Sequence, residues 1–218
     1  MSNPAVSTHE SILENTRLCP LLSLKQDRKL VYINLGSIVT GNMLDKHPTY
    51  CDPLVRLYML VMNCVMENSD YDILLITSNS GENFEAMFRT YLTRLSENKH
   101  RLHFCDWINQ VSFLRDHQPA MFVYHGGGNS LREAVTACVP LLVIPFFGDQ
   151  LCTANVVHFC GIGRSLRLDF SAGDGNSNTI DMEETYLTAE GQRYIGAGLV
   201  DVMSRLEGFR ANIEKLKQ

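Results

Sequence analysis

Residues 124–134, YHGGGNSLREA, place polar side chains around three consecutive glycines. An apolar run, AMFVYH, precedes the glycines and a helical pattern, NSLREAVTAC, follows them, so the segment joins a strand to a helix. The free N–H groups and the dipole of a helix N-terminus attract anions, and glycines let an anion approach the backbone. The segment could therefore hold a phosphate with His125, Asn129 and Ser130. It could also be an ordinary turn in which Asn129 caps the helix.

Polar or aromatic residues also follow three other apolar runs that we predict to be strands. Gly36 and Ser37 end the first strand, Trp107 ends the third and Gln110 comes just after it, and Asp149 and Gln150 lie at the end of the fifth. The carboxyl ends of parallel strands share one edge of a sheet, where ligands bind. These groups are therefore predicted to converge on the glycine turn, which favours a ligand site over a simple helix cap.

Short apolar segments alternate with helical patterns along most of the chain. Predicted strands lie at 29–37, 71–78, 101–107, 120–125, 141–146 and 163–170. Predicted helices lie at 51–68, 84–95, 129–138, 150–161, 186–206 and 208–218, and residues 112–117 are predicted to form a short helix or turn. This alternation is typical of an α/β fold, a doubly wound, Rossmann-like parallel sheet of about six strands. The glycine turn does not have the GxGxxG spacing, so a dinucleotide fingerprint is not indicated.

Composition excludes several classes of function. The chain has 218 residues, 45% of them hydrophobic, and a formal charge of −5, which argues against a broad nucleic-acid surface. Its seven cysteines form no CxxC pair, so neither a zinc site nor a disulfide framework is indicated. The longest apolar region, LVRLYMLVMNCV, is too short to span a bilayer. The chain as given is expected to be cytoplasmic, although a lumenal, membrane-anchored parent enzyme is possible.

Residues 107–150 resemble the signature box of the UDP-glycosyltransferases, the inverting family 1 enzymes with the two-domain GT-B fold. The family pattern is W-x-P-Q, HGGxNSxxE, a small-V-P turn and DQ. This chain reads W-I-N-Q, HGGGNSLRE, CVP and GDQ, and INLGS matches an upstream strand ending in Gly-Ser. The resemblance covers roughly residues 29–168 and implies the C-terminal, donor-binding half of a GT-B glycosyltransferase.

The resemblance also implies how the chain is organised. Residues 1–28 would be a lead-in or interdomain linker, and residues 29–218 the nucleotide-sugar donor-binding domain. The last helix, 207–218, would cross toward an N-terminal acceptor-binding domain that is absent from this sequence.

A role for each matched residue follows from the same resemblance. The indole of Trp107 would stack on uracil, the backbone around Ile108 would read the base edge, and Gln110 would support the nucleoside. Glu133 would accept hydrogen bonds from the ribose hydroxyls. The diphosphate would be held by Ser37, His125, Gly127, Asn129 and Ser130, and the sugar hydroxyls by Asp149 and Gln150.

Each assignment has a structural alternative. Trp107 could belong to the core, Glu133 could be a solvated helix residue, and Asp149 could only cap the next helix. Ser37 has the weakest case, because Gly-Ser turns are common.

Three positions depart from the family pattern. Asn109 stands in place of the usual Pro and is expected to loosen the turn that presents the base. Thr153 replaces an Asn, and Cys138 replaces a common Gly.

The implied function is donor binding for the transfer of a hexose from a UDP-sugar to a hydroxyl of a small lipophilic acceptor. The helix N-terminus and His125 would stabilise the leaving UDP, with no metal and no cofactor. In the family the catalytic base, usually a His, lies in the N-terminal domain. No catalytic residue is therefore assigned here, and the chain is expected to be a glycosyltransferase that is inactive alone.

Two alternatives stay open. The chain could be the donor-binding subunit of a two-chain N-acetylglucosaminyltransferase that needs a membrane-bound partner chain, or a non-catalytic UDP-sugar-binding module. The sequence does not separate glucose, glucuronic acid, galactose and N-acetylglucosamine as the sugar.

Overall fold

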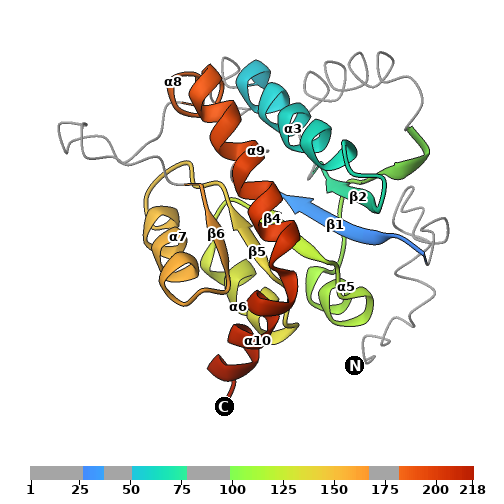
Figure 1. Ribbon diagram of the computed structural model, residues 1–218, viewed down its shortest axis with the longest axis vertical. Coiled ribbons are helices and arrows are strands. Elements are labelled where there is room, and N and C mark those ends of the chain that lie inside the picture. The colour runs from blue at the N-terminus through green and yellow to red at the C-terminus, as the bar shows by residue number, and fades with distance from the viewer. Residues whose placement is uncertain (1–26, 37–50, 78–98, 167–181) are drawn as a thin grey trace, which may run out of the picture.

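The computed structural model describes residues 27–36, 51–77, 99–166 and 182–218 (Figure 1). Its six strands are β1 (Lys29–Asn34), β2 (Tyr71–Ile76), β3 (Leu102–Cys105), β4 (Met121–Tyr124), β5 (Leu141–Val143) and β6 (Gly163–Ser165). They form one sheet in the order β3-β2-β1-β4-β5-β6, and every neighbouring pair is parallel. The predicted six-stranded, Rossmann-like parallel sheet is confirmed.

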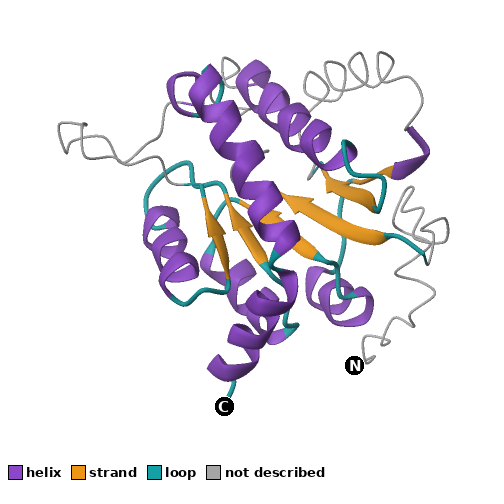
Figure 2. Ribbon diagram, in the orientation of Figure 1, coloured by secondary structure: helices purple, strands orange, loops and turns teal. Residues whose placement is uncertain are grey.

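Helices cover both faces of this sheet (Figure 2). Among the described residues the α-helices are α3 (Cys51–Met66), α5 (Gln110–His117), α6 (Gly128–Thr136), α7 (Gln150–Phe159), α8 (Met182–Thr185), α9 (Ala189–Ser204) and α10 (Leu206–Leu216), and η4 (Lys99–Arg101) is a 3₁₀ turn. The helix predicted at 84–95 and the end of the strand predicted at 163–170 lie outside the described residues. The helix predicted from residue 186 begins later, because Thr188 accepts a hydrogen bond from Gly191 N–H and caps α9.

The alternating side chains of the strands build a separate core on each face. Val31 and Ile33 of β1 pack with α3 and α9, which lie side by side across the front of the sheet in Figure 1. Tyr32 points to the other face, where its core includes Phe113 of α5 and Ala134 of α6. Successive side chains of a strand point to opposite faces, so β1 contributes to both cores.

The strand order reverses between β1 and β4. β1 pairs with β2 on one side and with β4 on the other, and Asn34 at its carboxyl end lies opposite Tyr124. The chain continues away from this junction in both directions, which leaves a crevice above the ends of β1 and β4.

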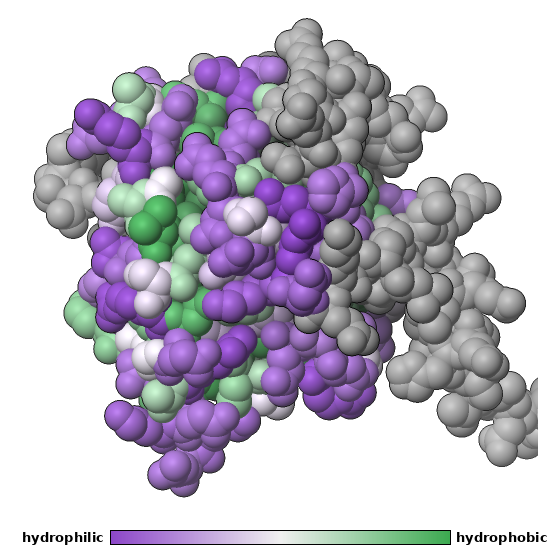
Figure 3. Space-filling model, turned by 45° about the vertical axis from the view of Figure 1, so that its right-hand side comes forward, coloured by the Kyte–Doolittle hydropathy of each residue, from purple (hydrophilic) through white to green (hydrophobic). Residues whose placement is uncertain are grey.

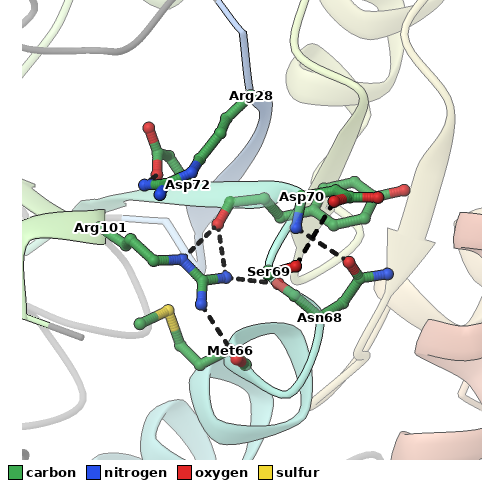
Figure 4. Close-up of polar contacts among 8 residues, drawn as sticks. Arg28, Met66, Asn68, Ser69, Asp70, Asp72 and Arg101 are labelled. Atoms are coloured by element: carbon green, nitrogen blue, oxygen red, sulfur yellow. Dashed lines mark hydrogen bonds and ion pairs between the residues drawn. The ribbon is translucent and has the colours of Figure 1, made fainter. Parts of the chain in front are cut away.

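The opposite end of the sheet is held by two arginines (Figure 4). Arg101 is only 3% exposed, and its guanidinium donates to the carbonyls of Met66, Asn68 and Tyr71. Arg28 forms an ion pair with Asp72 at 3.2 Å. Arg101 thereby satisfies a free carbonyl at the end of α3 and fixes the turn that leads into β2.

Helix α10 also packs against this opposite end, across the loops that precede β4, β5 and β6. Its side chains donate to the carbonyls of Pro119, Gly161 and Thr136 from Arg210, Asn212 and Lys217. These contacts place the last helix away from the crevice. Within the described residues, no helix is long and apolar enough to cross a membrane.

Cys138, in the turn after α6, has a left-handed backbone conformation, with φ of 58°. Its thiol contacts the Glu214 carboxylate at 3.0 Å and the Lys217 ammonium at 3.1 Å. A residue with a side chain is strained in this conformation, whereas glycine is not.

We therefore expect Cys138→Gly to raise the free energy of unfolding by about 0.5–1 kcal/mol, because relief of strain outweighs the greater entropy of the unfolded chain. Urea denaturation measures the change. Cys138→Ala is the control, since it also loses the thiol contacts but keeps the strain. Equal stability of the two variants would show that the backbone conformation is not the cause.

Candidate functional site

A cleft of about 600 Å³ opens in the crevice above β1 and β4. Ten of the eleven predicted site residues line it, namely Trp107, Ile108, Gln110, His125, Gly127, Asn129, Ser130, Glu133, Asp149 and Gln150. The eleventh, Ser37, lies outside the described residues. The lining also includes residues that the sequence analysis did not assign, among them Asn34, Ile76, Val111, Gly128 and Phe147. Asn34 and Ile76 end β1 and β2, so the expected sheet edge could have identified them.

His125 sits between two glycines at the bottom of the cleft. A Cβ on Gly36 would collide with the imidazole ring, and a Cβ on Gly127 would lie 2.6 Å from Nε2. Both glycines are therefore required by the close approach of the ring to the backbone. Gly126 is required for a different reason, because its φ is 100°.

Burial lowers the pKa of His125 to about 4. The Asp149 carboxylate and a hydrogen bond with the Asn34 backbone act in the opposite direction, but they are weaker than the desolvation of the ring. At pH 7 the ring is therefore neutral and brings no positive charge of its own. A neutral imidazole has a single N–H donor, so His125 can offer an anion a hydrogen bond only in place of its contact with the Asn34 backbone.

The N-terminus of α6 faces the cleft without a side-chain cap. Gly127 is the N-cap residue and makes no capping bond, so the alternative in which Asn129 caps this helix is not supported. Asn129 lies within the first turn, where its Oδ1 accepts a hydrogen bond from Arg132 at 3.0 Å. The helix begins at Gly128, directly after the glycine against which the His125 ring packs. The first N–H groups of α6 are thereby left available to a ligand.

A network of polar side chains lies under the neighbouring part of the cleft. Gln110, the first residue of α5, accepts hydrogen bonds from Tyr32 and Asn34, both at 2.9 Å. Its amide nitrogen donates to Ser130 at 3.0 Å and to Glu133 at 2.6 Å. Glu133 is thus a bound member of the site, and the alternative of a freely solvated helix residue is not supported.

Trp107 projects from the loop between β3 and α5, and 60% of its surface is exposed. This exposure excludes the alternative of a core tryptophan. The Cys105 thiol donates to the Trp107 carbonyl at 2.9 Å, and Asn109 caps α5 by accepting from Ser112 N–H at 3.2 Å. Asn109 has φ of −69°, which is a proline-like value, so the turn keeps its shape without proline. Asn109 thus caps α5 at the position where the family pattern has proline.

Few large hydrophobic side chains are exposed in the part of the chain that the structure describes. Among the described residues the large exposed hydrophobic side chains are Trp107, Val111, Val156, Phe159, Val200 and Leu216. Trp107 and Val111 line the cleft. On the face in Figure 3 hydrophilic residues predominate, and the hydrophobic ones form a narrow, broken band. An exposed indole beside a polar cleft suits a flat ring that carries polar groups.

Asp149 and Gln150 stand where α7 begins. Asp149 occupies the N-cap position, but its side chain makes no capping bond and lines the cleft. Gln150 is only 3% exposed, and its Oε1 accepts from the N–H groups of Phe146 at 2.8 Å and Phe147 at 3.2 Å. Gln150 therefore holds the loop after β5, and Asp149 is the more accessible of the two. Among the described residues, no group of three His, Cys, Asp or Glu side chains could hold a metal ion.

Known proteins resemble this chain in sequence. Residues 89–180 match the family model "UDP-glucoronosyl and UDP-glucosyl transferase". UDP-glycosyltransferase CGT of Oryza sativa subsp. japonica is 27% identical over 165 residues, which is 75% of this chain and 32% of that protein. UDP-glucuronosyltransferase 3A1 of Mus musculus is 36% identical over 100 residues, which is 46% of this chain and 18% of that protein.

A solved structure supports the same relationship at the level of the fold. Os79 from O. sativa, crystallised in complex with UDP, aligns with 90% of this chain and 37% of its own chain, with a TM-score of 0.61 and 19% identity. The chain spans at most about a third of the length of the first curated relatives that it matches.

We expect the protein to become less stable as the pH is lowered, because of His125. Between pH 6.5 and about 4 the unfolded chain binds a proton at this residue while the folded chain does not, so folding is favoured less as pH decreases. Each unit of lowered pKa is worth about 1.4 kcal/mol. In His125→Gln this loss should be smaller, which urea denaturation across the pH range measures. Burial also lowers the pKa of His103, so part of the loss should remain. Parallel curves of unfolding free energy against pH for the wild type and His125→Gln would contradict this prediction.

We also expect Gly127→Ala to raise the pKa of His125 from about 4 toward its usual value. Alanine suits the backbone conformation at 127, with φ of −65°, but its methyl group displaces the ring toward solvent. Titration of the imidazole signals by NMR measures the pKa. Gly128→Ala is the matched control, since its added methyl group meets no atom within 4 Å. The same pKa in both variants would refute the role given to Gly127.

Proposed function

We propose that this chain, which belongs to the UDP-glycosyltransferase family, binds the UDP-sugar donor of an inverting glycosyl transfer reaction. The observation that carries this proposal is the convergence of Trp107, Glu133, His125 and the open N-terminus of α6 in one cleft. These groups correspond to the three parts of a nucleoside diphosphate, which are a flat base, a ribose with two hydroxyls and a doubly charged diphosphate.

The base and the ribose belong at the α5 side of the cleft. The exposed indole of Trp107 offers a stacking surface for uracil, and the backbone at Ile108 lies beside it to read the base edge. Glu133 keeps a carboxylate oxygen that Gln110 does not occupy, and this oxygen can accept hydrogen bonds from the ribose hydroxyls. This order along the cleft supports a uridine nucleotide, and the bound UDP in the Os79 structure agrees with it.

The diphosphate belongs at the N-terminus of α6. Gly127 and Gly128 expose backbone N–H groups, and the helix dipole adds positive potential at this point. Asn129, whose oxygen is bound by Arg132, and Ser130 add side-chain donors. His125 contributes an N–H. We assign the stabilisation of the leaving UDP to these groups and propose no metal or other cofactor for this step.

The sugar extends toward Asp149 at the start of α7. A carboxylate there can accept hydrogen bonds from hexose hydroxyls. Transfer also needs a base that deprotonates the acceptor hydroxyl. We propose that this base and the site for a small lipophilic acceptor are contributed by an N-terminal domain or partner chain, as the family resemblance implies. The chain by itself is then a donor-binding unit with little transferase activity.

We expect UDP to quench the fluorescence of Trp107, which is the only tryptophan of the chain. Stacking of uracil on the indole should make the quenching saturable and selective for UDP over ADP and CMP. Glu133→Ala should weaken UDP binding by about 1–3 kcal/mol, because it removes a charged hydrogen-bond acceptor.

The matched control is Glu207→Ala on α10, where the glutamate is 89% exposed and lies at the opposite end of the sheet. No saturable response in folded protein would refute the proposed donor site. UDP binding that is unaffected by Glu133→Ala would refute the role of the carboxylate alone. Strong UDP binding without transfer in the presence of any acceptor domain would favour a non-catalytic UDP-sugar-binding module.

A further inference from the structure

Tyr32 lies directly beneath the cleft but cannot touch a ligand. It is 0% exposed, and its ring packs between Phe113 and Phe122 with centroid distances of 4.8 and 4.7 Å. Its hydroxyl reaches Gln110 Oε1 at 2.9 Å. The aromatic packing fixes the position of this hydroxyl, so Tyr32 is a rigid support for the amide of Gln110.

The donors and acceptors of this network have one consistent direction. Asn34 accepts from Gly36 N–H at 2.9 Å through Oδ1, which identifies its Nδ2 as the donor. That nitrogen donates to the Tyr32 hydroxyl at 3.2 Å and to Gln110 Oε1. The Tyr32 hydroxyl accepts from Asn34 and therefore turns its own proton toward Gln110. Two donors thus converge on Oε1, and the NH₂ group of Gln110 must face the other way.

The amide of Gln110 has no capacity left for a ligand. A carboxamide offers two acceptor sites and two N–H donors. Tyr32 and Asn34 occupy the oxygen, while Ser130 and Glu133 take the two N–H groups. Direct contact of this side chain with the nucleoside would require one of these bonds to break. The geometry points instead to action through Ser130 and Glu133.

We infer that Tyr32 and Gln110 are positioning residues that set the hydrogen-bond polarity of the donor site. This inference rests on the proposed function. Gln110 donates to Glu133, which is held as an acceptor with one oxygen free for the ribose hydroxyls. Ser130 accepts from the same amide, so its own proton remains available to a phosphate oxygen.

The arrangement answers a specific electrostatic problem. The Glu133 carboxylate must stay next to a bound diphosphate, although like charges repel each other. The short bond from Gln110 to Glu133, at 2.6 Å, restrains the carboxylate against this repulsion. A reversed amide would place its oxygen against the carboxylate. Tyr32 and Asn34 prevent that reversal, because both would then face an NH₂ group.

The test compares two ligands in the full chain by calorimetry. They are UDP and 2′,3′-dideoxyuridine 5′-diphosphate, which lacks both ribose hydroxyls. The wild-type protein should bind UDP more tightly. Tyr32→Phe should weaken UDP binding by about 3- to 10-fold and binding of the dideoxy ligand by less, because that ligand can lose only the contact with Ser130, so the preference for UDP should fall.

Tyr71→Phe is the matched control, because Tyr71 is a buried tyrosine at the opposite end of the sheet. This variant should prefer UDP over the dideoxy ligand as strongly as the wild type does. Gln110→Met, at the start of α5, is a second variant and should show the same selective loss if Tyr32→Phe does not fold. Equal weakening of both ligands, or an unchanged preference, would overturn the inference. A wild-type protein that binds neither ligand would instead refute the proposed function on which it rests.

Discussion

The pairing of β1 with β4 is the constraint on which the cleft depends. Its register sets Asn34 opposite Tyr124, so the chain leaves both strands at the same height. Gly36 and His125 then follow their strands into direct contact, and only glycine leaves room for the ring. Because the strand order reverses at this pair, the described helices that follow β1 and β4 lead away from it, and the backbone of β1 and the N-terminus of α6 can share one opening.

Tight packing around His125 also determines the electrostatics of the site. Buried between backbone segments, the ring is neutral at pH 7, so the attraction for an anion comes mainly from the uncapped end of α6. Fixed dipoles of this kind need no reorganisation when charge develops on a leaving group. The network below α5 and α6 adds a second form of preorganisation, since it orients Glu133 before any ligand arrives.

Sequence patterns predicted the strands and the convergence of the site well, but local roles less well. Asn129 was considered as the cap of α6, yet Gly127 occupies the N-cap position. Asn109, which replaces the usual proline, caps α5, and the family pattern gave no sign of this role. Gln110 was matched to the nucleoside by its position in the box, whereas its four hydrogen bonds go to other side chains. The partners of Gln110 lie on β1 and α6, which are far from α5 in the sequence, so local patterns did not indicate them.

The sequence by itself determined the order of strands and helices, because hydrophobic periodicity is a local property. It also determined which residue types would follow each strand, and their spacing carries the resemblance to the UDP-glycosyltransferases. Only the tertiary structure decided how these residues share their hydrogen bonds and which glycines are required. Those properties depend on contacts between β1, α5 and α6, and on the few ångströms between the His125 ring and two backbone segments. Spacing along a chain does not encode such distances, since they arise only when strands that are separated in sequence pair in register.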